Sequence, residues 1–216
     1  MDAKLRKWLK WLKVIHDEVL DLVISKDIFW EVQNIIKTNR RIHQPSDFYS
    51  YLGNTYVSHA VMGVRRQLKV DNQSISFARL LEEIVDRPQT LSREYYVGLY
   101  KGSAVEDLAE GFFDKFSGTS QVHVCPHMVC NDLAQIKEVA RRCEDFADRR
   151  VAHRDKRGPR VLPRFDDLDT CIECLDKLYT KYHRMFHAQG NGSLMPKYQY
   201  DWKAVFREPW IVKGAE

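Results

Sequence analysis

Residues 5–23 read LRKWLKWLKVIHDEVLDLV, and this stretch decides the fold class. Its apolar residues recur every three or four positions, which is the period of an α-helix with one buried face. They are Leu5, Trp8, Leu9, Leu12, Ile15, Val19, Leu22 and Val23. We therefore expect a long amphipathic helix over residues 3–23, with this stripe packed on a core.

The same period continues through most of the chain and predicts an all-α helical bundle. Ser25 or Asp27 could cap a second helix, and Pro88 should end a short helix capped by Ser74 or Ser76. The longest helices are expected at residues 3–23, 48–70, 131–153 and 166–188, and Asn131 or Asp132 should cap the start of the third. The middle is harder to interpret: residues 95–100 and 105–116 could be helical, and residues 118–128 look irregular, with a possible short strand at 122–124.

Length and composition favour a single domain. The chain has 216 residues, of which 44% are hydrophobic, so it can bury a core without metals or disulfides. We expect a core over about residues 1–190, and an extension over 191–216 that packs on it through Trp202, Phe206 and Trp210. No run of eighteen apolar residues occurs, and charges interrupt the N-terminal stretch, so neither a membrane span nor a signal peptide is expected. The odd count of five Cys suggests reduced thiols in the cytoplasm.

Two short segments concentrate the positive charge. Residues 1–13 hold five basic residues against one acidic residue, and residues 141–160 hold eight against four. Because the whole chain has a net charge of +4, the rest of it is acidic. Two basic segments on an acidic body suit a polyanionic partner. Two solvated helix faces would explain the pattern equally well.

The second basic segment contains ADRRVAHRDKR, residues 147–157. In a helix, Arg149 and His153 would share a face at positions i and i+4. Arg can hold a phosphate through two parallel hydrogen bonds, and His can exchange a proton near neutral pH. Such a pair could cleave RNA without a metal, with His activating the 2′-hydroxyl or protonating the leaving oxygen and Arg stabilising the phosphorane. Cations at a helix C-terminus also complement the helix dipole, whatever the function.

The segment resembles the signature of the HEPN superfamily, most of all its abortive-infection branch in bacteria. The residues that fit are Asp148, Arg149, Val151, Ala152, His153 and Asp155. Residues 58–66 and 74–81, a long helix followed by a short one, also resemble that branch. The resemblance implies an HEPN-like helical bundle, RNA as partner, a site in a groove at a homodimer interface, and a bacterial defence or toxin-type system with a possible protein antitoxin or regulator.

On this resemblance, the candidate residues have three roles. The catalytic candidates are His153 and Arg149; the phosphate- or RNA-binding candidates are Arg142, Arg150, Arg154 and Lys156; the motif-supporting candidates are Asp148 and Asp155. One departure matters, because aligning Asp148 on the family's polar position puts Ala147 where the motif Arg is expected. Two readings therefore remain: a metal-independent endoribonuclease, and a catalytically silent domain that binds RNA, a nucleotide or a protein.

Other patterns in the sequence are weaker. His123, Cys125, His127 and Cys130 are potential zinc ligands, but two Cys-x-x-Cys pairs at the separation of a zinc finger are absent, so we expect no metal and no cofactor. Trp8 and Trp11 among lysines could lie on an anionic membrane, although packing of the stripe on the core is favoured. Neither a Gly-rich phosphate loop nor a Gly-x-Ser-x-Gly elbow occurs.

Overall fold

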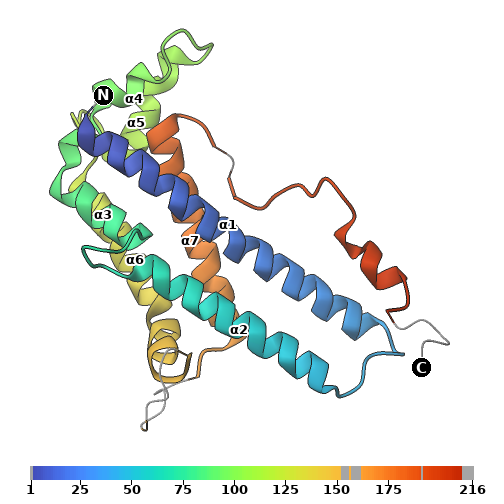
Figure 1. The fold of residues 1–216 in the computed structure, drawn as a ribbon. Helices are drawn as coiled ribbons and strands as arrows, with labels where there is room; N and C mark the ends of the chain where they lie inside the picture. The colour runs from blue at the N-terminus through green and yellow to red at the C-terminus, as the bar shows by residue number, and fades with distance from the viewer. Residues whose placement is uncertain (1, 152–155, 157–161, 191, 211–216) are drawn as a thin grey trace.

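The structure is a computed structural model that describes residues 2–151, 156, 162–190 and 192–210, and it is all-helical (Figure 1). The α-helices are α1 (Ala3–Thr38), α2 (Asp47–Leu68), α3 (Phe77–Asp86), α4 (Arg93–Gly98), α5 (Ala109–Ser117), α6 (Pro126–Phe146) and α7 (Phe165–His187). A π-helical turn, Ala147–Val151, continues α6, and 3-10 helices occur at Pro88–Thr90, Glu106–Leu108 and Trp202–Arg207. The prediction of an all-α fold is confirmed. Where a short strand was considered, the described residues contain one isolated bridge, between Ser92 and His123.

The core lies among the four longest helices together with α3. Helix α7 packs against α1 on one side and α6 on the other, while α2 and α3 close the bundle (Figure 1). Trp8 is fully buried, and its ring meets Phe186 of α7 edge-on with 6.3 Å between ring centroids. The apolar stripe predicted for residues 5–23 is therefore the surface of α1 that packs on the core.

Helix α1 does not break where a second helix was expected. It runs without interruption for 36 residues, about 54 Å at 1.5 Å per residue. The prediction of a cap at Ser25 or Asp27 was wrong, because both side chains have tertiary partners instead: Ser25 Oγ contacts His59 Nε2 at 3.2 Å, and Asp27 Oδ2 accepts from the Tyr198 hydroxyl at 3.0 Å. Since neither Gly nor Pro interrupts the stretch, the helix continues to Thr38.

Helix α6 begins five residues earlier and ends seven residues earlier than predicted for residues 131–153. Pro126 occupies its first turn, where a missing backbone N–H costs nothing. Asp132, one of the expected caps, is instead nearly buried inside the helix, where it accepts a hydrogen bond from the Tyr182 hydroxyl at 2.8 Å. The α-helical hydrogen bonding stops at Phe146, where the π-helical turn begins.

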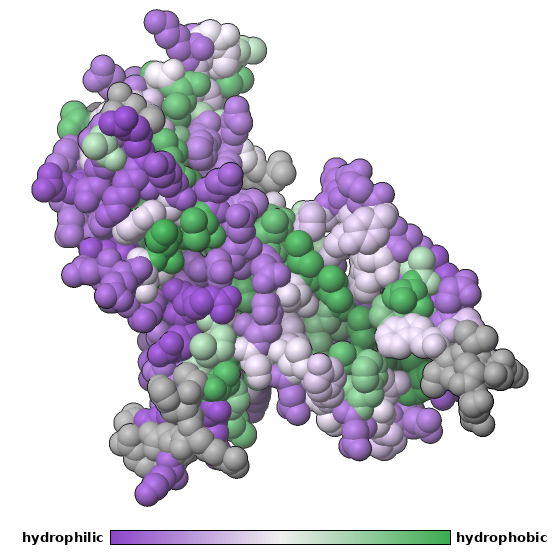
Figure 2. Space-filling view, in the orientation of Figure 1, coloured by the Kyte–Doolittle hydropathy of each residue, from purple (hydrophilic) through white to green (hydrophobic). Residues whose placement is uncertain are grey.

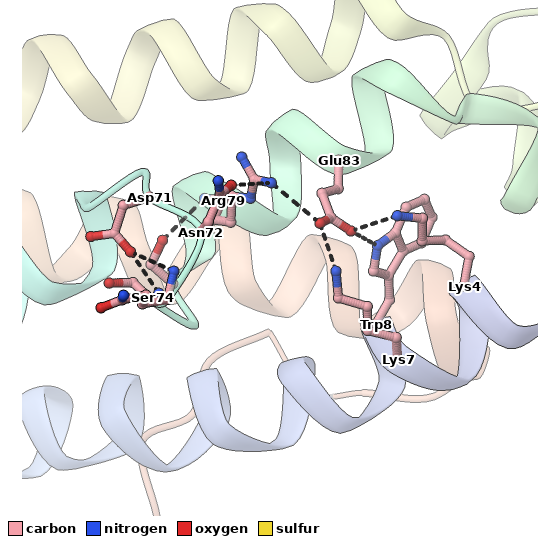
Figure 3. A network of polar contacts seen from close by, with 10 residues as sticks. Lys4, Lys7, Trp8, Asp71, Asn72, Ser74, Arg79 and Glu83 are labelled. Atoms are coloured by element: carbon pink, nitrogen blue, oxygen red, sulfur yellow. Dashed lines mark hydrogen bonds and ion pairs between the residues drawn. The ribbon is translucent and has the colours of Figure 1, made fainter.

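A buried carboxylate joins the N-terminal end of α1 to α3. Glu83 accepts hydrogen bonds from Lys4 Nζ at 3.2 Å, Lys7 Nζ at 2.7 Å and the Trp8 indole at 2.8 Å (Figure 3). Lys7 also lies over the ring of Trp11, 4.1 Å from its centroid. The favoured interpretation of this helix, one stripe packed on the core, agrees with these contacts. Within the described part of the chain, no helix has the length and apolarity needed to cross a bilayer.

The segment after α7 returns along α1 (Figure 1). Tyr198 donates to Asp27, and Lys203 forms an ion pair with Glu31, so the segment contacts the second half of α1. Its aromatic rings contact one another: Phe206 stacks on Trp210, with 6.0 Å between ring centroids. Trp210 also meets Phe48 of α2, but keeps 63% of its surface exposed.

Candidate functional site

The described part of the candidate motif, residues 147–151 and Lys156, follows α6 at one end of the bundle, close to the start of α7 (Figure 1). Ala147 is fully buried there, while Arg150 and Lys156 are exposed. Three other candidates, His153, Arg154 and Asp155, lie outside the described residues. The geometry of the site is therefore built from residues 142–151, Lys156 and their neighbours on α2 and α7.

The local backbone differs from the one on which the pairing of Arg149 and His153 was based. An i,i+4 spacing places two residues on one face only in an α-helix. Residues 147–151 form a π-helical turn, whose hydrogen bonds join residues five apart. The expectation of an α-helical register through this segment was wrong. Turns of this kind inside or after α-helices frequently occur at functional sites.

Two candidate arginines of the segment, Arg142 and Arg149, contact carboxylates. Arg149 Nε lies 2.7 Å from Asp145 Oδ1, one turn back, and 20% of the Arg149 side chain is exposed. Arg142 Nη1 lies 3.1 Å from Asp167 Oδ1, near the start of α7. A phosphate that binds either guanidinium must therefore compete with a carboxylate already in place.

The motif-supporting candidate Asp148 has a clear structural partner. Its Oδ1 accepts a hydrogen bond from Arg65 Nε of α2 at 2.6 Å, which ties the π-helical turn to that helix. Arg65 belongs to residues 58–66, the upstream stretch that resembles the family. No role in the site was predicted for it. Its place in the last turn of α2, beside Arg66, was the available signal.

A second carboxylate, that of Glu144, lies near enough to this pair to feel both of its charges. Burial raises the pKa of Glu144, and the neighbouring charge of Asp148 raises it further, against the opposing effect of Arg65 and Lys137.

We use the term arginine-rich end for Arg65, Arg142, Arg149 and Arg150 together. Of these, Arg150 is exposed and contacts no carboxylate within the described ranges, so it is the member most open to an incoming anion.

Three polar side chains on α1 and α2 resemble a hydrolase triad in composition, but not in geometry. Ser25 Oγ and Asp21 Oδ2 lie 3.2 Å and 3.3 Å from the same atom, Nε2 of His59. A serine nucleophile needs its base on one ring nitrogen and the orienting carboxylate on the other. The trio is therefore a polar contact between two helices.

The cysteines are free thiols in this structure. Cys143 Sγ and Cys171 Sγ lie 3.4 Å apart in the core, and this hydrogen bond together with burial raises the pKa of the Cys171 thiol. Thiols with a raised pKa are poor nucleophiles and poor metal ligands. Across the described residues, no three His, Cys, Asp or Glu side chains are grouped so that they could hold a metal ion.

Comparison with known proteins gave no match: no family model matches the chain, and no curated protein or solved structure is significantly similar to it.

Proposed function

We propose that this chain is an HEPN-like protein of a bacterial defence or toxin-type system that binds RNA at its arginine-rich end. The observation that carries the proposal is the placement of four arginines in or beside the C-terminal end of α6: Arg65 in the last turn of α2, which contacts Asp148, Arg142 in α6, and Arg149 and Arg150 in the π-helical turn. Guanidinium groups bind phosphate oxygens through paired hydrogen bonds and make binding depend on salt.

The carboxylates at this end define how RNA would bind. Arg150 and Lys156 are exposed and meet the first phosphate, and Arg149 then exchanges Asp145 for a second one. This exchange lowers the net affinity, because the ion pair must break before the phosphate contact forms. Replacing Asp145 by Asn should therefore raise the affinity for RNA.

Binding is better supported than cleavage. The position aligned with the family's motif Arg is Ala147, which is fully buried and carries only a methyl group. Any stabilisation of a phosphorane would fall to Arg149, which already holds Asp145. Cleavage by His153 with Arg149 is the second candidate, and the variant His153→Ala decides it: loss of cleavage, and of any toxicity on expression, would establish the enzyme.

The test of binding is fluorescence anisotropy with a labelled single-stranded RNA over a range of salt concentrations. Arg150→Ala should weaken binding several-fold and lower the slope of log K against log salt by about 0.7, the contribution of one phosphate contact on a single strand. The matched control is Arg40→Ala, an exposed arginine in the turn after α1 at the opposite end of α2. Equal losses in both variants, or no binding by the wild type, would contradict the proposal.

The family resemblance also implies a homodimer with the residue 142–153 face near the two-fold axis. We propose that Arg150 and Lys156 of two copies line a shared groove, into which a protein antitoxin or regulator could also bind. Light scattering at micromolar concentration should give twice the mass of the chain. A monomer under those conditions would remove the shared groove, but leave binding by a single copy testable as above.

A further inference from the structure

Two cysteine side chains meet in the core where α6 packs on α7. Sγ of Cys143 and Sγ of Cys171 lie 3.4 Å apart, although the two residues are separated by 28 positions in the chain. Cys143 is fully buried, and only 1% of Cys171 is exposed. The fold thus brings together, from two different helices, the two groups that a disulfide bond would join.

The contact is close to the geometry of a disulfide. The S–S bond is about 2.05 Å long, so the two sulfurs must approach by about 1.4 Å, which small rotations about the two Cα–Cβ bonds can supply. The ion pair between Arg142 and Asp167 holds the same two helices together, one residue before Cys143 and one turn before Cys171. Because the fold already fixes the two thiols beside each other, their reaction with each other loses little further entropy.

The hydrogen bonds of the reduced pair are weak. Cys171 Sγ donates to the backbone oxygen of Val139 at 3.4 Å, and the other printed contact of this thiol is the one with Cys143. A thiol is a weak donor, and its sulfur is a weak acceptor. A covalent bond between the two sulfurs would therefore replace little that stabilises the reduced state.

An oxidant cannot reach the pair through the surface cavity next to α7. This cavity of about 730 Å³ lies between α1, α7 and residues 193–199, which form part of the C-terminal segment. Figure 2 shows hydrophobic residues at the surface between α1 and this segment. Neither Cys143 nor Cys171 is among the described residues that line it. In the closed fold, the hydrogen bond and burial also raise the pKa of the Cys171 thiol, so little reactive thiolate is present.

The end of α6 provides a route to the pair. Cys143 lies in the last turn of α6, four residues before the π-helical turn begins at Ala147. Helix ends open locally at a lower free energy than the body of a helix. Opening of this turn exposes Cys143 first and lets its thiol ionise in water, while Cys171 stays on α7.

We propose that Cys143 and Cys171 are a site of oxidative modification, at which a low-molecular-weight disulfide such as oxidised glutathione links α6 to α7. The Cys143 thiolate attacks one sulfur of the glutathione disulfide, and the first glutathione leaves as a thiolate. Cys171 then loses its proton to solvent and attacks the Cys143 sulfur, and the second glutathione leaves. In sum, two protein thiols are oxidised to one disulfide, and one glutathione disulfide is reduced to two glutathione thiols.

The experiment is incubation of the full chain with oxidised glutathione, followed by alkylation of the remaining thiols, digestion with trypsin and mass spectrometry. Trypsin cleaves after Lys and Arg, so Cys143 lies in the peptide 143–149 and Cys171 in the peptide 165–177. We expect these two peptides joined, with two hydrogen atoms fewer than the sum of the free peptides. A reducing agent should separate them.

Matched variants assign the bond, because the peptide 165–177 also contains Cys174. Cys143→Ala should abolish the link, whereas Cys174→Ala, which removes a thiol that is 8% exposed, should keep it. Both variants should retain the helical circular dichroism of the wild type, since a buried thiol packs as a small apolar group.

Two further measurements test the route and the fit of the bond. Urea below the unfolding transition should speed the linkage several-fold, because it favours opening of the last turn of α6. The linked chain should unfold at a temperature several degrees higher than the reduced chain, because the bond closes a loop in the unfolded state.

Several results would overturn the proposal. One is the absence of joined peptides after prolonged incubation, and another is a link that survives in Cys143→Ala or disappears in Cys174→Ala. A linked chain that unfolds at a lower temperature would show that the bond does not fit the fold. Arg150→Ala, which tests the RNA site, should leave the linkage unchanged, so the two proposals fail separately.

Discussion

The two basic segments of the chain carry the same excess of four positive charges, yet the structure uses them differently. Near the N-terminus, Lys4 and Lys7 converge on Glu83, whose side chain is only 8% exposed. In the segment at the end of α6, Arg149 pairs with Asp145, and Asp148, whose side chain is 57% exposed, pairs with Arg65 of α2. The first arrangement is part of the core boundary, and the second lies at the surface. Burial of the carboxylate, and not the charge count, therefore separates a structural contact from one that a ligand can displace.

The largest expected effect is a loss of stability when a charged side chain replaces the buried Ala147. Ala147→Arg should lower the free energy of unfolding by about 3–5 kcal/mol, because the new side chain overfills the site and buries a guanidinium without a partner. Urea unfolding followed by circular dichroism measures it. Arg150→Ala, a change at an exposed residue, should stay within about 0.5 kcal/mol of the wild type. A normally stable Ala147→Arg that binds RNA more tightly would show that this position can reach the site.

The Glu83 contacts should make the fold sensitive to acid. Burial acts to raise the pKa of Glu83, but hydrogen bonds from Lys7, Trp8 and Lys4 outweigh it and lower the pKa from 4.5 to about 2. Because the folded state has the lower pKa, the stabilisation is complete above about pH 4.5 and is lost as the pH falls toward 2. At 1.36 kcal/mol per unit, it amounts to at most about 3 kcal/mol.

Glu83→Gln isolates this contribution. The amide still accepts a hydrogen bond from Trp8 but lacks the charge, so at pH 7 the variant should be about 2–3 kcal/mol less stable than the wild type. The difference should shrink as the pH approaches 2, where the wild-type carboxylate also becomes neutral. Unfolding curves at pH 7, 4.5, 3 and 2 give the comparison, and a difference that does not change with pH would contradict the charge-based explanation.

A smaller effect is expected at the start of α7. Asp167 accepts a hydrogen bond from the Arg164 backbone N–H at 2.8 Å and also contacts Arg142. Asp167→Ala should cost about 1–2 kcal/mol, mainly through the lost helix cap. Arg142→Ala removes the ion pair but keeps the cap, so its cost in thermal unfolding should be clearly less. Equal costs would mean that the ion pair, and not the cap, stabilises this end.

The smallest effect should come from the exposed ion pair of Asp148 and Arg65. Asp148→Ala removes the partner of Arg65 and should change the free energy of unfolding by less than about 1 kcal/mol, and by less still in high salt. The same variant should bind RNA more tightly, because it leaves a guanidinium without a competing carboxylate. A large loss of stability would place this pair in the same class as the Glu83 contacts.

Much of the fold followed from the periodicity of apolar residues. The helices predicted at 48–70 and 166–188 agree with α2 and α7 within one or two residues at each end. The failures came from polar residues near Ser25 and Asp132, which were interpreted as caps. Their side chains bind partners 34 and 50 residues away along the chain. A local pattern contains no information about such distant partners.

The candidate site shows the same division. The sequence placed Arg142, Arg149 and Arg150 in one basic segment, but it did not pair them with carboxylates or bring Arg65 of α2 beside Asp148. The cavity under the C-terminal segment was not predicted at all. Its lining residues, among them His16, His183 and Lys197, come from three separate stretches of the chain.

The helical class, the buried stripe of α1 and the position of the basic segments were all predictable from the sequence, because each depends on residues a few positions apart. The tertiary structure alone decided that α1 continues past Ser25, that Ala147 is buried, and which positive charges meet a carboxylate. The physical reason is that periodicity reports which face of a helix avoids water. The partner of a charge depends on which distant helix packs beside it.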